Sequence, residues 1–182
     1  MSKPEEPGAQ ESSQTPRTQA QWIALARDVL DVEMQGLAAV REGLGTSLVR
    51  AMTLLAKCAG RVAVIGVGKS GLVARKIAAT LSSTGTPAFF LHPVEGLHGD
   101  MGMLQSRDAV LALSNSGETG ELNAIIPALK ALGAAVIVLT GKPDSTLAKL
   151  ADEVIDCAVP KEACGLNLAP TASTTAALAV GA

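Results

Sequence analysis

Five short aliphatic runs, separated by segments with helical spacing, constrain the fold of this chain more than any other feature. The runs predict strands at residues 61–66, 88–91, 109–113, 135–140 and 153–159. Between them, apolar spacing predicts helices at 71–83, 121–132 and 145–150, a short helix or loop at 94–101, and a last helix from residue 171 onward. Several strands are apolar on both faces, which is typical of a parallel sheet covered by helices on both sides. The pattern therefore predicts an α/β fold.

Two helices are expected before the first strand. Apolar residues recur at three- and four-residue steps from Trp22 to Leu44, and Thr46 or Ser47 can cap a second helix that runs through Lys57. The helix at 21–44 carries more apolar surface than one sheet face needs, so we expect it to pack against a neighbouring subunit. Residues 1–18 are rich in Pro, Glu, Gln, Ser and Thr, and a disordered tail is expected there.

Composition excludes several classes of protein. The 182 residues suit about one domain, and 15 basic against 17 acidic residues leave no basic stripe for nucleic acid. Aromatic residues make up only 2%, so platforms for stacking bases are also missing. No apolar run reaches the roughly 18 residues of a membrane span, and the N-terminus lacks the apolar core of a signal peptide. Three cysteines without metal-ligand spacing favour reduced thiols and a cytoplasmic protein.

The first strand ends in the glycine-rich turn GVGKSG at residues 66–71. It matches the dinucleotide fingerprint G-x-G-x-x-G, but residues 84–92 hold no acidic residue to bind a ribose. A P-loop is excluded because the position that would need its first glycine is Ala63. The turn instead predicts an anion site at a helix N-terminus, with the positive charge of Lys69 beside it.

The third strand is followed by SNSGETGE at residues 114–121, directly before a predicted helix. Ser114, Ser116 and Thr119 supply hydroxyl groups, and two glycines allow close approach of the backbone. Hydroxyl groups at a helix N-terminus predict a seat for one phosphate. The alternative is a helix cap formed by Ser116 or Thr119. Because Glu118 and Glu121 have the wrong charge for a phosphate, we expect at least one of them to face the rest of the ligand.

Two further strand ends carry groups that can move protons. Both histidines of the chain, His92 and His98, follow the second strand, and Glu162 follows the fifth. Since the carboxyl ends of parallel strands share one edge of the sheet, these groups are candidates for the same site. A transition metal is an open alternative there, although the two histidines are only two ligands and no cysteine joins them in sequence.

Taken together, the motifs resemble the sugar isomerase (SIS) domain, and within it the arabinose-5-phosphate isomerase group. The residues that carry the resemblance are GVGKSG, SSTGTP, HPVEGLHGDMGM, SNSGETGE and PKEACGLNLAPTASTT, in that order. The resemblance covers residues 20–182, so we divide the chain into a tail at 1–18 and an SIS domain at 19–182. It implies a three-layer α/β/α sandwich with a five-stranded, flavodoxin-like parallel sheet, assembled as a homotetramer.

The resemblance also implies an activity. The reaction is the interconversion of D-ribulose 5-phosphate and D-arabinose 5-phosphate through an enediol, which feeds Kdo and lipopolysaccharide synthesis. No cofactor is required. The small-molecule partner is a pentose 5-phosphate, and neither nucleic acid nor membrane is involved.

Site residues follow from the positions of the matching motifs. Lys69, Glu121 and Glu162 fall on catalytic positions, and the base is Glu121 or a histidine that the family carries beyond residue 182. Phosphate and substrate contacts fall on Ser70, Gly85, Thr86, His92, His98, Ser114, Asn115, Ser116 and Thr119. His92 is also implied as the site of an inhibitory zinc ion.

The chain departs from the family pattern at its end. It stops before the histidine of a His-Pro-Gly-Gly stretch and before the CBS domains of full-length members, so we expect a fragment that binds substrate but turns it over weakly. Two alternative functions stay open. One is a heptose-phosphate isomerase of the same fold, which uses a metal, and the other is a sensor that binds a phosphosugar without converting it.

Overall fold

The five predicted strands form one sheet in which all neighbours pair in parallel, in the order β2-β1-β3-β4-β5. The computed structural model describes residues 17–166 and 168–182. The strands are β1 (Val62–Gly66), β2 (Ala88–Leu91), β3 (Ala109–Leu113), β4 (Ala135–Thr140) and β5 (Glu153–Asp156). The helices are α1 (Gln19–Gly43), α2 (Thr46–Lys57), α3 (Gly68–Ser83), α4 (Pro93–Leu97), α5 (Gly120–Leu132), α6 (Thr146–Leu150) and α7 (Ala172–Gly181), with a 3-10 turn η1 (Asp100–Met103). The predicted α/β fold with a five-stranded parallel sheet is confirmed.

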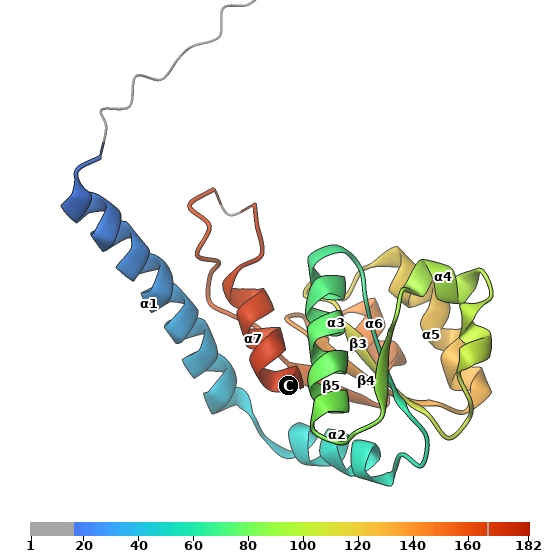
Figure 1. Ribbon diagram of the computed structural model, residues 1–182. Helices are drawn as coiled ribbons and strands as arrows, with labels where there is room; N and C mark the ends of the chain where they lie inside the picture. The colour runs from blue at the N-terminus through green and yellow to red at the C-terminus, as the bar shows by residue number, and fades with distance from the viewer. Residues whose placement is uncertain (1–16, 167) are drawn as a thin grey trace, which may run out of the picture.

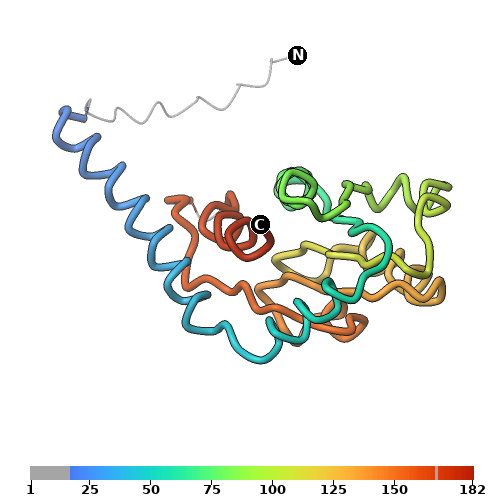
Figure 2. The backbone as a smooth tube through the Cα atoms, turned by 60° about the horizontal axis from the view of Figure 1, so that its bottom comes forward, coloured from blue at the N-terminus to red at the C-terminus, as the bar shows by residue number. Residues whose placement is uncertain are grey.

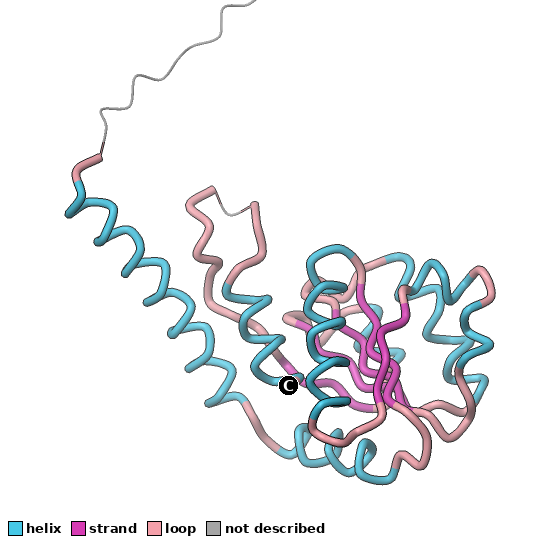
Figure 3. The backbone as a smooth tube through the Cα atoms, viewed as in Figure 1, coloured by secondary structure: helices cyan, strands magenta, loops and turns pink. Residues whose placement is uncertain are grey.

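Helices cover both faces of the sheet, which lies in the middle layer (Figure 3). Alternate residues of the central strands point to opposite faces, so Ala63 and Ile65 pack with α5 and α6, whereas Val62 and Val64 pack with α2, α3 and α7. β1 and β3 are buried along their whole length. Burial on both faces explains why these strands read as continuous apolar runs in the sequence.

Helix α1 lies mostly outside this sandwich. Its C-terminal half contacts α7, where Gly36 is buried against Val159 and Ala172, and its N-terminal half extends away from the body (Figures 1 and 2). Large apolar side chains stay exposed along it: Trp22, Ile23, Leu25, Val29, Leu30, Met34 and Leu37. Exposed apolar surface on this scale is typical of an interface between proteins.

Two predicted boundaries differ from the structure for local reasons. The fifth strand was expected to reach residue 159 but ends at Asp156, because the Asp156 carboxylate accepts a hydrogen bond from the Ala158 amide at 2.8 Å and turns the chain. α3 begins at Gly68 rather than Gly71, since the Gly71 amide already donates to the Val67 carbonyl as in a helix.

The N-terminal prediction is tested only in part. Residues 1–16 of the expected tail at 1–18 lie outside the described residues, and Thr18 caps α1 through the amide of Gln21. Within residues 17–166 and 168–182, every helix is too short or too polar to span a bilayer.

Candidate functional site

The turn from β1 into α3 depends on two close approaches between backbone atoms. A Cβ at Gly66 would lie 2.9 Å from the Ser70 carbonyl oxygen, and one at Gly71 would lie 2.8 Å from the Gly66 carbonyl oxygen. Side chains at these positions would push the helix away from the strand end. The turn therefore holds Ser70, which is half-buried, against the carboxyl edge of the sheet, while the Lys69 side chain is exposed.

The loop from β3 into α5 is organised by its own hydroxyl groups. Ser114 is buried, and its Oγ lies 2.8 Å from Thr119 Oγ1 and accepts a hydrogen bond from the Gly117 amide at 3.0 Å. Ser116 Oγ accepts from the Glu118 amide at 3.2 Å. Thr119 is the N-cap residue of α5 but makes no side-chain capping bond. The capping alternative therefore does not account for these hydroxyl groups.

Hydrogen bonds from the first turn of α6 hold the same loop in place. The Gly117 carbonyl accepts from the Leu147 amide at 3.0 Å, and Glu118 Oε1 accepts from the Thr146 amide at 2.8 Å. The Thr146 backbone and side chain also hold the pKa of Glu118 below its usual value. Gly117 has a φ of 64°, and a Cβ there would overlap Ser145. Glu118 thus serves the loop and does not line the cavity that the loop borders.

The ends of β4 and β5 add residues that sequence reasoning missed. Thr140 is the last residue of β4 and Gly141 follows it, and the Gly141 amide donates to the Asn115 carbonyl at 3.0 Å, joining the two loops. Cys157 follows β5 and is buried, which raises the pKa of its thiol to about 12, with a smaller contribution from Asp156. The thiol is therefore neutral. The rule that ligands bind at carboxyl ends of parallel strands was a sufficient signal for these positions.

Glu162 lies between the end of β5 and the start of α7. Its Oε2 accepts hydrogen bonds from the Thr171 amide at 2.7 Å, the Thr171 hydroxyl at 3.0 Å and the Ser173 amide at 3.2 Å. Burial acts to raise the pKa of Glu162, but the Ser173 and Thr171 groups outweigh burial and hold the pKa below its usual value. Glu162 is therefore an anchored carboxylate.

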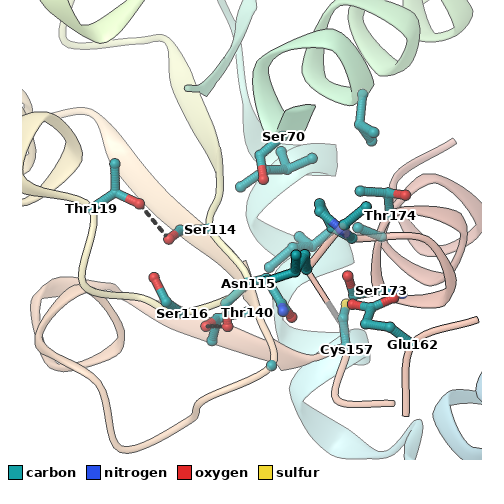
Figure 4. Close-up of a pocket in the computed structure, with 18 residues that line it drawn as sticks. Ser70, Ser114, Asn115, Ser116, Thr119, Thr140, Cys157, Glu162, Ser173 and Thr174 are labelled. Atoms are coloured by element: carbon teal, nitrogen blue, oxygen red, sulfur yellow. Dashed lines mark hydrogen bonds between the residues drawn. The ribbon is translucent and has the colours of Figure 1, made fainter. Parts of the chain in front are cut away.

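These elements enclose a cavity of about 450 Å³ at the carboxyl edge of the sheet (Figure 4). Six of the predicted site residues line it: Ser70, Ser114, Asn115, Ser116, Thr119 and Glu162. Ser173 and Thr174 of α7 also line it, and sequence reasoning missed both. Hydroxyl groups on one side and the N-terminus of α5 have the chemistry that suits a phosphate, and phosphate binding there stays a prediction.

The other predicted site residues do not reach this cavity in the structure. Lys69 and Glu121 lie at the first turns of α3 and α5, beside it but outside its lining. Gly85 and Thr86 precede β2 and so lie at the opposite edge of the sheet, where Thr86 borders a separate apolar cavity of about 270 Å³. Their roles as substrate contacts stay predictions.

The two histidines flank α4. His92 is half-buried at its N-cap, where Nδ1 accepts from the Val94 amide at 3.3 Å, and His98 is exposed at its C-cap. Neither lines the cavity. The part of the chain that the structure describes holds no cluster of three or more His, Cys, Asp or Glu side chains suited to a metal ion. Zinc at His92 stays a prediction.

A comparison with protein families identifies the chain. The SIS domain model matches residues 54–182, which is more than half of its length. The chain belongs to the SIS domain family. The SIS domain model therefore covers all five strands and every loop that borders the cavity.

Curated relatives agree with this assignment. The SIS chain is 50% identical over 160 residues to the arabinose 5-phosphate isomerase KdsD of Pseudomonas aeruginosa, covering 88% of this chain and 49% of that protein. It is 50% identical over 155 residues to the arabinose 5-phosphate isomerase GutQ of Escherichia coli K12, covering 85% and 48%. The chain thus spans about half the length of the curated relatives it matches.

Solved structures share the fold. E. coli CFT073 c3406, solved in complex with arabinose 5-phosphate, superposes with a TM-score of 0.87 at 41% identity, over 91% of this chain and 88% of that one. A second solved structure, from Listeria monocytogenes, gives a TM-score of 0.87 at 33% identity, over 91% of this chain and 87% of that one. The predicted SIS fold is therefore confirmed by structures as well as by sequence.

Proposed function

We propose that this SIS domain carries the active site of an arabinose 5-phosphate isomerase. The observation that supports this most directly is the hydroxyl-lined seat formed by Ser114, Ser116 and Thr119 at the N-terminus of α5. A relative with the same fold was solved in complex with arabinose 5-phosphate, and curated relatives at about 50% identity carry the name of this enzyme. The seat suits the 5-phosphate, which leaves the sugar to extend toward α7.

The proposed reaction moves one proton between neighbouring carbons through an enediol. A base removes the carbon-bound proton beside the carbonyl group, and a second proton moves between the two oxygens. We assign Glu121, or a histidine that follows this segment in the family, as the base and Lys69 as the group that stabilises the developing oxyanion. Glu162 completes the set, and its lowered pKa suits a fixed anion better than a proton donor.

The proposal extends to the setting of the enzyme. The product would supply Kdo for lipopolysaccharide synthesis in the cytoplasm. The reaction needs no redox cofactor because no electrons leave the substrate, and we propose that it needs no metal ion.

We also propose a homotetramer in which the exposed apolar side chains of α1 contact a neighbouring subunit. Trp22, Leu30 and Met34, each more than half exposed, are the largest apolar contributors.

The test gives ribulose 5-phosphate to the full-length protein and identifies the product by NMR in deuterated water. We expect arabinose 5-phosphate with deuterium on the carbon that receives the proton, and an unchanged rate after treatment with a chelator. Glu121→Gln should lower the rate by about 10²–10⁴, the usual contribution of one general base. A different sugar phosphate, or loss of activity with the chelator, would contradict the proposal.

A further inference from the structure

The two ends of the cavity differ in chemistry. Ser114, Ser116 and Thr119 lie on one side, and Glu162, Ser173 and Thr174 lie on the other (Figure 4). Among the described residues that line the cavity, Glu162 is the one side chain that carries a charge. The end that faces the phosphate seat is therefore negative, and no lining cation compensates for it within the described part of the chain.

The Glu162 carboxylate is fixed in place and keeps an oxygen for a ligand. Its Oε2 accepts all three hydrogen bonds from Thr171 and Ser173, and in the described part of the chain Oε1 accepts none. A fourth bond, from the Ala163 amide to Thr171 Oγ1 at 2.7 Å, closes the same loop. Rotation of the carboxylate away from the cavity would break these bonds, so the negative charge is a permanent part of the lining.

Ser173 adds a buried hydroxyl group behind the Glu162 carboxylate. Its side chain is 3% exposed and borders the cavity, but Oγ has no hydrogen-bond partner among the described residues. The hydroxyl lies close enough to the carboxylate to help hold it ionised without reaching hydrogen-bond geometry.

Together these groups suit a neutral polyol and oppose an anion. A sugar hydroxyl can donate to Glu162 Oε1, whereas a second phosphate would meet the carboxylate directly. We propose that Glu162 makes this pocket selective for sugar monophosphates and excludes sugar bisphosphates. The inference rests on the proposed function, because it takes the hydroxyl seat as the site of the first phosphate.

The expected selectivity is large enough to measure. A carboxylate and a phosphate dianion about 6 Å apart repel one another enough to weaken binding about tenfold, even at the dielectric constant of water. The partly buried cavity has a lower effective dielectric constant, so about tenfold is a lower bound. The repulsion should also weaken with added salt, because screening acts over about 10 Å at 0.1 M ionic strength.

The test measures calorimetric binding of arabinitol 5-phosphate and arabinitol 1,5-bisphosphate, two ligands that share the first phosphate and cannot be isomerised. We expect the wild-type chain to prefer the monophosphate by at least about tenfold, and Glu162→Gln, which has the same shape, to reduce that preference to less than about threefold. The matched control is Glu118→Gln, which removes one charge from the phosphate side, where Glu118 binds the Thr146 amide. It should affect both ligands alike and keep the preference.

Each possible result of this binding test supports or overturns the role of Glu162. Equal affinities in the wild type, or an unchanged preference in Glu162→Gln, would overturn the role of Glu162 while leaving the proposed function intact. Failure of the wild type to bind either ligand would overturn both. If Glu162→Gln does not fold, the wild-type preference is measured from about 20 mM to about 500 mM salt, a range over which screening becomes strong. A preference that shrinks with salt supports repulsion by the carboxylate, and one that does not change refutes it.

Discussion

Replacing Ser116 by alanine tests the phosphate seat with little disturbance of the fold. Ser116 is exposed, lines the cavity, and accepts one hydrogen bond from the Glu118 amide at 3.2 Å. Water can satisfy that amide in the variant, so we expect the free energy of unfolding to change by less than about 0.5 kcal/mol. Ser114 is a poorer choice, because its buried Oγ organises the loop through the Gly117 amide and Thr119.

The effect on binding should be much larger. A hydrogen bond to a charged group is worth about 1.5–3 kcal/mol, so Ser116→Ala should weaken binding of arabinose 5-phosphate by about 10- to 150-fold. Calorimetric titration measures this change, and thermal unfolding confirms that the fold is kept. Ser106→Ala is the matched control, since Ser106 is an exposed serine in the loop before β3, at the opposite edge of the sheet. Unchanged affinity in Ser116→Ala would show that the hydroxyl only shapes the turn.

The same geometry gives expected outcomes for four other substitutions. Lys69→Gln should weaken phosphate binding by less than about fivefold, because the exposed Lys69 lies outside the cavity lining and a surface charge pair contributes about 0.2–1 kcal/mol. A larger loss of affinity would show that Lys69 is the main phosphate ligand. Gly117→Ala should lower the free energy of unfolding by about 2–4 kcal/mol, from the φ of 64° and the overlap with Ser145, and a thermal midpoint equal to that of the wild type would refute this. Because the pKa of Glu118 is lowered in the folded state, its carboxylate stabilises the fold above the unfolded pKa of 4.5, and this stabilisation is lost as the pH falls through the folded pKa. Denaturant unfolding should therefore show that Glu118→Gln loses less stability than the wild type between about pH 7 and about pH 3. Leu30→Glu on α1 should convert the proposed homotetramer into a smaller species, as measured by light scattering, and a monomeric wild type at micromolar concentration would contradict the proposed interface.

The sequence predicted the sheet well because each strand carries its own signal. Ala109–Leu113 is apolar throughout, and the structure buries all five of its residues between two layers of helices. Strand β5 was predicted less accurately because it lies at the edge of the sheet, where a single side chain can end it. The Asp156 carboxylate does so through the Ala158 amide, a bond that apolar periodicity does not encode.

The site was predictable where hydroxyl groups follow a strand and not where distant segments meet. Ser114 and Ser116 were found because they follow β3 directly. Ser173 was missed because it reaches the cavity only through the loop that returns from Glu162 to α7. The sequence also did not predict the hydrogen bond that Glu118 accepts, because its donor Thr146 lies 28 residues further along the chain.

The hydrogen-bond partners of Glu118 and Glu162 explain how two carboxylates can lie near the proposed phosphate seat. Glu118 accepts the Thr146 amide and ties the loop to α6, so that a negative residue stiffens the seat without facing the phosphate. Glu162 is held by Thr171 and Ser173 on the far side of the same cavity. With the α5 N-terminus at one end and a fixed carboxylate at the other, the proposal gives a sugar monophosphate one favourable orientation, in which the phosphate meets α5 and the hydroxyl groups meet Glu162. In the proposed complex, the placement of fixed dipoles and one charge thus sets the orientation of the substrate before any catalytic group acts.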